Sequence, residues 1–254
     1  MEFELSKWYG DCISESGEVR IAYSARVRYG RLKVGYSGLL DGETATHSLR
    51  PYRIADEGQT LSWEGSGRSA ALSAKWTRQD APLWATVFES EEGAVEWCPV
   101  MPKGSASMNG VCGLGYAEHL RMTIAPWKIP IRTLRWGRFL TPNTTLIWMD
   151  WQGPFATRIV FFNGQRVLAE AIDDGGLLLD NRSRIYLDRA HVLRGGDLGS
   201  TVFAAVPGIG RIAPARMFRV DECKWKSRAR MQVPGEPAED GWCIHEVVNW
   251  PCGE

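Results

Sequence analysis

The chain has 254 residues, enough for one or two domains of about 150 residues each, and it can bury a core without disulfide or metal staples. Lysine plus arginine and aspartate plus glutamate both number 30, so the sequence lacks the basic excess that favours binding to nucleic acid or an anionic membrane. Hydrophobic residues make up 44%, which is typical of a globular chain rather than a disordered one. The twelve tryptophans outnumber both phenylalanine and tyrosine.

The start of the chain has no apolar run of signal-peptide length, and no stretch approaches the roughly 18 apolar residues of a membrane span. The cysteines form no Cys-x-x-Cys pair, which argues against a zinc ribbon or a redox motif. They are Cys12, Cys98, Cys112, Cys223, Cys243 and Cys252. We therefore expect a soluble cytoplasmic protein with reduced, mostly buried thiols and no membrane span.

The dominant local pattern has a period of two residues. From Val19 to Tyr29 the odd positions are apolar or aromatic and the even positions are mostly polar, which predicts a half-buried antiparallel strand. Arg31–Tyr36 repeats the pattern after Gly30, as expected for a hairpin. Further strand-like runs are Thr60–Trp63, Ala70–Trp76, Trp84–Phe88, Val95–Trp97, Thr145–Trp151, Arg158–Phe162, Val167–Ile172, Arg184–Leu187, Thr201–Ala205, Ala215–Val220, Lys224–Met231 and Trp242–Val248. Turn signals between them are Asp41-Gly42, Glu57-Gly58, Asn163-Gly164, Gly195-Gly196-Asp197 and the loop that begins at Pro234.

Many short strands and no convincing helical periodicity predict an all-β protein rather than a βαβ enzyme. One eight-stranded barrel cannot use so many strands. We therefore expect two tandem lipocalin-like antiparallel β-barrel domains, residues 1–122 and 123–254. Their joint is expected near residues 118–130, where Pro126 and Pro130 interrupt the pattern.

Glycine and histidine motifs point to no cofactor. Gly113-Leu114-Gly115 lacks both the third glycine and the strand–helix setting of a dinucleotide-binding turn. The sequence contains no nucleophile elbow and no phosphate-binding loop. The four histidines are far apart and show no metal-ligand spacing. We therefore expect neither a cofactor nor a metal site.

The segment Gly113–Arg138 carries most of the candidate chemistry. In an extended strand Tyr116 and Glu118 share one face, and His119 lies on the other. We treat these three residues as candidates for proton transfer. Glu118 has two open interpretations, a structural ion-pair partner or a general acid.

The segment Leu146–Trp151 is apolar on both alternating faces except for Asp150, so we expect this strand to be covered on both sides. An ionised Asp150 among tryptophans is costly to bury. Either Arg135 or Arg138 neutralises it in a structural pair, or burial raises its pKa and it serves as a general acid.

Tryptophans of such a chain pack mainly in the core, but twelve are enough for some to line a ligand pocket as well. The residues expected to contact a ligand are Trp127, Arg135, Trp136, Arg138, Trp148 and Trp151.

The order of these elements resembles a known family. A strand-rich first half opens with Trp8-Tyr9 and Asp11, and Gly113–Glu118, Pro126–Phe139 and Leu146–Gly153 follow. This order is similar to the two-domain lipocalin-like family of AttH-like proteins and hydroxyneurosporene synthase (carotenoid 1,2-hydratase). Diels–Alderase-type pericyclases have a related architecture.

The resemblance spans most of the chain and is most specific between Gly113 and Gly153. The family centre has a Gly-x-Gly-Tyr element, an acidic residue and a Trp-Gly pair, which correspond here to Gly113–Tyr116, Glu118 and Trp136-Gly137. In hydratase-like members the Trp-Gly pair follows the acidic residue closely, whereas here Leu120–Leu134 intervenes. The resemblance therefore implies a pocket for a bulky hydrophobic molecule but does not identify that molecule.

Three functions remain open from the sequence. The first is a cofactor-independent hydratase, cyclase or isomerase that acts on a hydrophobic terpenoid, polyene or polyketide-like substrate by acid catalysis and positioning. The second is a non-catalytic carrier of a hydrophobic small molecule. The third is an interaction protein with a tryptophan-rich surface. The sequence does not indicate an oligomeric state.

Overall fold

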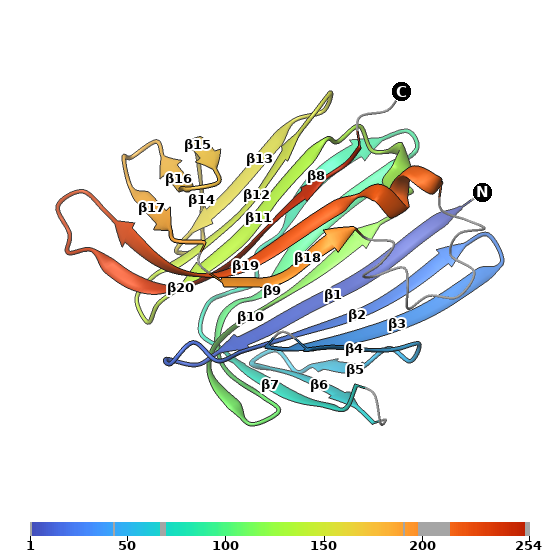
Figure 1. The fold of residues 1–254 in the computed structure, drawn as a ribbon, viewed down its shortest axis with the longest axis horizontal. Coiled ribbons are helices and arrows are strands. Elements are labelled where there is room, and N and C mark those ends of the chain that lie inside the picture. Colours follow the sequence, from blue (N-terminus) through green and yellow to red (C-terminus); the bar gives the residue numbers. More distant parts are fainter. Residues whose placement is uncertain (1, 43, 67–69, 190, 198–213, 252–254) are drawn as a thin grey trace. The chain divides into compact units, whose positions relative to one another are not determined.

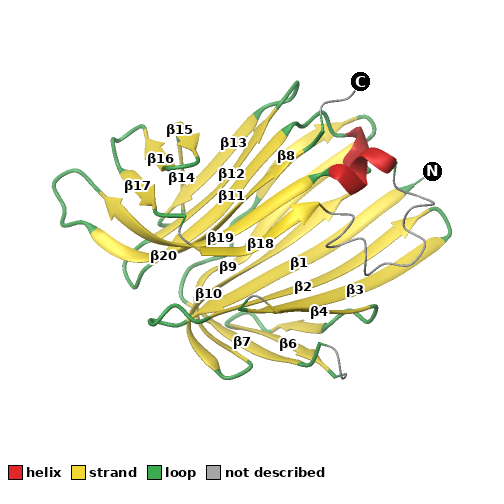
Figure 2. Cartoon of the chain, viewed as in Figure 1, coloured by secondary structure: helices red, strands yellow, loops and turns green. Residues whose placement is uncertain are grey.

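The structure is a computed structural model. It describes residues 2–42, 44–66, 70–189, 191–197 and 214–251. Its regular structure is almost entirely antiparallel strand (Figure 2), which confirms the all-β prediction. By its internal contacts the chain divides into two compact units, Met1–Ile129 and Pro130–Glu254.

The first unit is one ten-stranded antiparallel sheet in the order β4-β3-β2-β1-β10-β9-β7-β6-β5, with β8 paired to β9. Its strands are β1 (Phe3–Ile13), β2 (Val19–Tyr29), β3 (Leu32–Asp41), β4 (Thr44–Ser48), β5 (Arg53–Asp56), β6 (Thr60–Gly65), β7 (Leu72–Arg78), β8 (Ala85–Ser90), β9 (Gly93–Met108) and β10 (Val111–Met122). The single-turn 3₁₀ helix η1 (Pro126–Lys128) follows β10.

The second unit repeats this strand order in a second ten-stranded sheet, β14-β13-β12-β11-β20-β19-β17-β16-β15, with β18 paired to β19. Its elements are β11 (Thr133–Leu140), β12 (Thr145–Gln152), β13 (Thr157–Phe162), β14 (Gln165–Val167), β15 (Ala169–Asp173), β16 (Gly176–Leu179), β17 (Arg184–Leu187), β18 (His191–Asp197), the 3₁₀ helix η4 (Ala215–Arg219), β19 (Asp221–Gln232) and β20 (Glu239–Asn249). Both sheets curve strongly (Figure 1), one into a half-barrel and the other into a nearly closed barrel. The prediction of two tandem β-barrel domains is therefore confirmed.

One face of each sheet carries a hydrophobic core cluster, which we call the interior of that unit. In the first unit it includes Trp63 and Trp76, both fully buried, and in the second it includes Trp148. The Gly-x-Gly element leaves room for the core side chains, because a Cβ atom on Gly115 would lie only 2.6 Å from Nε1 of Trp76. A Cβ atom on Gly113 would lie 1.9 Å from the Ile13 carbonyl oxygen. These glycines therefore allow neighbouring groups to approach β10 closely.

Some of the turn and strand predictions are confirmed and others are wrong. The Asn163-Gly164 turn between β13 and β14 is confirmed by positive φ angles of 46° and 78°. The predicted turn Gly195-Gly196-Asp197 is wrong, because these residues pair with β19 as part of β18. The predicted strand Ala215–Val220 is wrong as well, because Ala215–Arg219 forms η4. The predicted strand Thr201–Ala205 lies outside the described residues.

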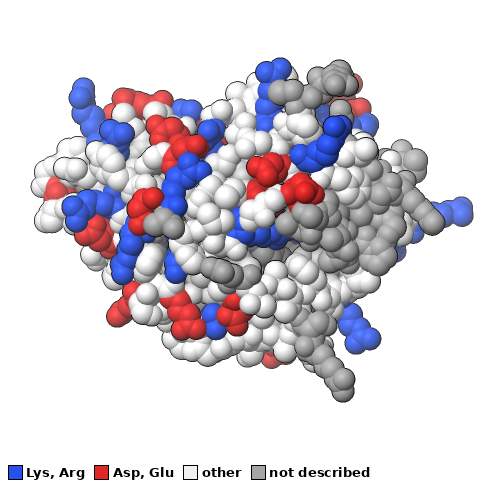
Figure 3. Space-filling model, in the orientation of Figure 1, with Lys and Arg blue, Asp and Glu red and all other residues white. Residues whose placement is uncertain are grey.

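The cysteines Cys12, Cys98, Cys112, Cys223 and Cys243 are all free, and Cys252 lies outside the described residues. The expectation of mostly buried thiols is only partly right, because Cys112 is exposed and two others are half-buried. Within the described ranges, no helix is long and apolar enough to cross a membrane. On the face shown in Figure 3, acidic and basic side chains are interspersed.

Candidate functional site

Two Tyr-x-acid pairs meet on neighbouring strands of the first unit. On β1 the pair is Tyr9 and Asp11, and on β10 it is Tyr116 and Glu118. The antiparallel register places Tyr9 opposite Glu118 and Asp11 opposite Tyr116. The four side chains therefore share one face of the sheet, the face opposite the interior.

Each tyrosine donates a hydrogen bond to the acid on its own strand. The Tyr9 hydroxyl lies 2.9 Å from Oδ2 of Asp11, and the Tyr116 hydroxyl lies 2.6 Å from Oε2 of Glu118. Asp11 and Tyr116 are fully buried, and Glu118 is 9% exposed. Both carboxyl groups are thus held in low-dielectric surroundings with a phenol as hydrogen-bond donor.

Glu118 has a second hydrogen-bond donor, which the sequence did not reveal. The indole Nε1 of Trp97 donates to the same oxygen, Oε2, at 2.5 Å. Trp97 lies on β9 and is fully buried. An acidic oxygen that accepts from both an indole and a phenol is fixed in orientation, and its anionic form is stabilised.

The backbone is irregular at Tyr116 and Glu118. The β9–β10 register shifts between Gly115 and Ala117 and again between Ala117 and His119. The two bulges therefore coincide with the two residues of this pair. Strand β9 contains Pro99 and Pro102 in this region, and proline within a sheet is tolerated at bulges because it has no N–H for the ladder.

Burial and charge keep Tyr116 protonated. Burial is the main cause that raises the pKa of Tyr116 well above its usual value, and the neighbouring carboxylates of Glu118 and Asp11 add to it. The ring of Tyr9 lies 6.1 Å from the ring of Tyr116 and 5.4 Å from that of Tyr23. The acids therefore lie among phenol rings that act as donors and as apolar walls.

His119 lies on the interior face, as the alternation predicted. Its ring stacks on Trp8 at 4.2 Å, and its Nε2 lies 2.8 Å from Oγ of Ser6. Burial, with a smaller contribution from Arg121, lowers the pKa of His119 to about 4. Because it faces the other side of the sheet, the structure does not bring His119 together with Glu118 and Tyr116.

Asp150 is buried, and β12 is covered on both faces as expected. Its partner differs from the prediction. Oδ1 of Asp150 pairs with Nε of Arg158 at 3.0 Å, and Gln152 donates to Oδ2 at 2.7 Å. Arg158 is opposite Asp150 in the β12–β13 register, so it reaches the carboxylate directly.

The two arginines expected to pair with Asp150 have other partners. Arg135 is opposite Asp150 on the other side but pairs with Asp174 at 3.3 Å. Arg138 is fully buried and donates to the Trp242 carbonyl oxygen at 3.1 Å.

The predicted ligand-binding tryptophans lie in different places. Trp127 in η1 packs edge-on against Phe3 and Tyr29. Trp136 is buried, with the Lys224 ammonium 5.1 Å from its ring. Trp148 belongs to the core of the second unit. Trp151 is buried, and its Nε1 has no acceptor among the described residues.

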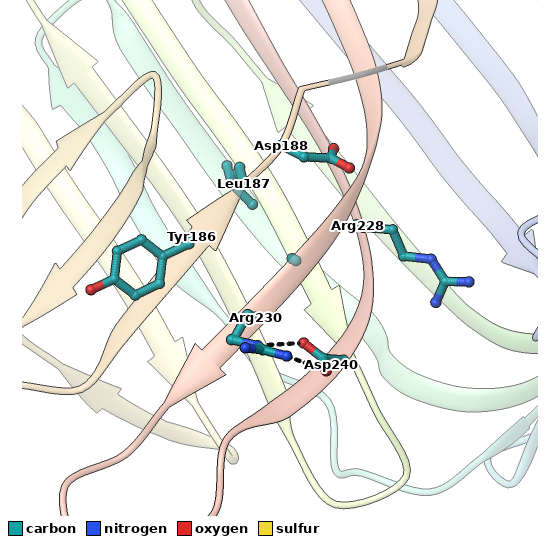
Figure 4. Close-up of a pocket in the computed structure, with 7 residues that line it drawn as sticks. Tyr186, Leu187, Asp188, Arg228, Arg230 and Asp240 are labelled. Carbon is teal, nitrogen blue, oxygen red and sulfur yellow. Dashed lines mark hydrogen bonds and ion pairs between the residues drawn. The ribbon is translucent and has the colours of Figure 1, made fainter.

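Among the pockets lined by described residues are two in the second unit. One, of about 540 Å³, is a shallow depression on β17, β19 and β20, bordered by Tyr186, Arg228, Arg230 and Asp240 (Figure 4). The other, of about 150 Å³, lies beside Asn143 and Glu239. Neither is lined by any of the predicted site residues.

The site residues that the sequence analysis missed are Tyr9, Asp11 and Trp97. The Tyr-x-acid spacing on β1 repeats that on β10 and could have indicated the first two. Trp97 carried no comparable signal, because only the β9–β10 pairing brings it to Glu118.

Neither a protein-family model nor a curated protein sequence matches the chain. Solved structures do. CghA, in a crystal structure with Sch210972, has a TM-score of 0.63 at 9% identity and covers 99% of this chain and 89% of its own. Kievitone hydratase from Nectria haematococca has a TM-score of 0.55 at 13% identity, over 96% of this chain and 88% of its own.

An AttH-like protein from Nitrosomonas europaea has a TM-score of 0.59 at 10% identity, over 98% of this chain and 93% of its own. Identities this low show the fold alone. At that level they confirm the resemblance predicted from the sequence. The chain therefore has the two-unit β fold that CghA, kievitone hydratase and this AttH-like protein share.

Proposed function

We propose that the protein is a cofactor-independent enzyme of the hydratase, cyclase or isomerase type, which acts on a hydrophobic small molecule by proton transfer at Glu118. The observation that carries this proposal is the convergence of Trp97 and Tyr116 on Oε2 of Glu118. A structural carboxylate needs a partner, but two aromatic donors on one oxygen also stabilise the carboxylate that forms when a general acid gives up its proton.

In a hydration, Glu118 alone can both donate the proton that is needed and take back the proton that is released. In its acid form Glu118 gives its proton to an alkene carbon of the substrate, and the donors from Trp97 and Tyr116 stabilise the carboxylate that forms. Water then adds to the carbocation, and the proton it loses returns to Glu118. Without water, loss of a proton or ring closure from the same cation gives an isomer or a cyclised product.

The surroundings favour an apolar substrate of terpenoid, polyene or polyketide-like character. The ring of Tyr9 lies 5.4 Å from that of Tyr23 and 6.1 Å from that of Tyr116. Aromatic faces of this kind attract a developing cation. Among the fold neighbours one is a hydratase and another, CghA, was crystallised with Sch210972, which supports a hydratase-type enzyme that acts on a small molecule.

The first experiment identifies the small molecule and the reaction. Molecules that co-purify with the recombinant protein are identified by mass spectrometry, and terpenoid, polyene and polyketide compounds of that class are then incubated with the protein. Chromatography with mass detection separates hydration, which adds one water, from cyclisation or isomerisation, which leaves the mass unchanged.

Glu118→Gln then tests the assignment. We expect it to abolish turnover, because the amide has no acidic proton, while substrate still binds and quenches tryptophan fluorescence. Glu96→Gln is the matched control on the neighbouring strand, since Glu96 is partly exposed and pairs with Arg121 at 3.4 Å. Binding without conversion by the unmodified protein would instead identify a carrier, and full activity of Glu118→Gln would remove Glu118 from the mechanism.

A further inference from the structure

The interior of the first unit contains a group of aromatic rings on the side of the sheet opposite Glu118. Trp8 stacks on His119, and its ring lies 6.2 Å from that of Trp63. Trp63 in turn lies 5.3 Å from Trp76 and 6.5 Å from Tyr52. These rings form a continuous aromatic wall that Trp8 and His119 extend beyond the fully buried core.

Trp63 and Arg78 in this interior carry buried N–H groups that have no acceptor among the described residues. Trp63 is fully buried, and its Nε1 has no hydrogen-bond partner among the described residues. Nε and Nη2 of Arg78 are buried in the same way. Asp56 supplies Arg78 with a counter-charge at 3.6 Å but not with a hydrogen bond. Buried donors without acceptors cost free energy, so an unmet donor often marks a bound group.

Some side chains at the edge of this interior are only partly buried. Trp8, Ile54 and Cys98 are only partly buried where they pack against the core. Cys98 is opposite His119 in the β9–β10 register, and Arg78 is close enough to influence the Cys98 thiol. Arg78 alternates onto the interior face of β7 with Trp76.

The second unit offers an internal comparison. There His245 on β20, the counterpart of β10, stacks on Trp225 at 5.2 Å and lies 2.8 Å from Oγ of Ser227. The Arg189 guanidinium covers Trp225 at 4.0 Å and pairs with Asp174 at 3.0 Å. In the second unit Asp174 therefore pairs closely with the arginine, whereas Nε and Nη2 of Arg78 donate no hydrogen bond to any described residue.

We infer that the interior of the first unit is a second ligand site, distinct from the Glu118 face, and that it takes a flat aromatic molecule bearing an anionic or carbonyl oxygen. Trp63 and Arg78 supply the hydrogen-bond donors for that oxygen. The stacked rings of Trp8 and His119 supply the surface that the aromatic part of the ligand contacts. A neutral His119 suits this role, because an imidazole without charge stacks on an apolar ring at a smaller desolvation cost than an imidazolium.

The probe is 1-anilinonaphthalene-8-sulfonate, which combines aromatic rings with an anionic acceptor. We expect saturable binding of one molecule with energy transfer from tryptophan, and a Kd about tenfold or more weaker in Arg78→Gln, because a charge-assisted hydrogen bond is lost. Trp63→Phe, which keeps a ring but removes the N–H, should weaken binding in the same direction. The uncharged probe N-phenyl-1-naphthylamine should bind the unmodified protein and Arg78→Gln equally.

Two controls locate the probe. Arg230→Gln removes a charge from an exposed ion pair beside the surface depression of Figure 4 and should leave the Kd unchanged. Glu118→Gln should also leave it unchanged, so the result is independent of the proposed enzymatic function. Equal affinity of Arg78→Gln and the unmodified protein would overturn the inference, as would a loss of affinity in Arg230→Gln or Glu118→Gln. Circular dichroism confirms that each variant is folded.

Discussion

Tyr9 on β1 and Glu118 on β10 are directly opposite each other in the antiparallel register. Each belongs to a Tyr-x-acid pair whose phenol donates along its own strand. The antiparallel direction reverses one pair relative to the other, so each acid is opposite a tyrosine rather than the other acid. This arrangement keeps the two buried carboxyl groups apart, because like charges in direct opposition are destabilising.

Tyr116→Phe should destabilise the fold by about 1–3 kcal/mol, because the buried Glu118 oxygen loses one of its two aromatic donors. Urea unfolding followed by circular dichroism measures this loss. Tyr9→Phe is the matched change on β1, where Asp11 loses its phenol. Unchanged midpoints in both variants would show that these hydrogen bonds contribute nothing to stability.

The Asp150–Arg158 pair should respond asymmetrically. The Asp150 side chain is 3% exposed and that of Arg158 is 35% exposed. Arg158→Met leaves a buried carboxylate without its cation and should cost about 3–5 kcal/mol. Asp150→Asn leaves an arginine that water can reach and should cost less. The test is a denaturant titration of both variants, and a larger loss in Asp150→Asn would contradict the structural role of the pair.

Acid should destabilise the fold through His245. Burial, with smaller effects from Arg189 and Lys224, lowers the pKa of His245 to about 3, compared with 6.5 when unfolded. Between these values the unfolded chain binds a proton that the folded chain does not, so stability is full above pH 6.5 and falls as the pH decreases toward 3. The slope from one such group is at most about 1.4 kcal/mol per pH unit.

Unfolding free energies at pH 7.5 and pH 5 test this. His245→Gln should flatten the decrease on acidification, whatever it does to stability at pH 7.5. His119→Gln should flatten it in the same direction, since its pKa is lowered to about 4. A decrease as steep as that of the unmodified protein in the double variant would assign the acid sensitivity to other groups.

Thiol titration should find close to six free cysteines in the denatured, unreduced protein. In the native protein the exposed Cys112 should react first, whereas the buried Cys12 and Cys243 should react only as the fold opens. Cys112→Ser should remove the fast phase. Two or fewer reactive thiols after denaturation would contradict the prediction of reduced cysteines.

Local alternation was sufficient for much of the fold. The strand predicted at Val19–Tyr29 has those bounds in the structure. The same rule placed Tyr116 and Glu118 together and His119 opposite them. It failed at Ala215–Arg219, a short run next to Pro214 that forms a 3₁₀ turn instead of pairing.

The contacts of the acids were decided by the tertiary structure. The sequence indicated that Asp150 is buried but left open whether an arginine pairs with it or it acts as a general acid. Strand register placed arginines on both sides of it; Arg135 pairs with Asp174, and Arg158 pairs with Asp150. Trp97 reaches Glu118 from 21 residues away through the β9–β10 pairing. A period of two fixes which face a side chain takes, whereas hydrogen-bond partners depend on which strands lie side by side, and that is set by the packing of the whole sheet.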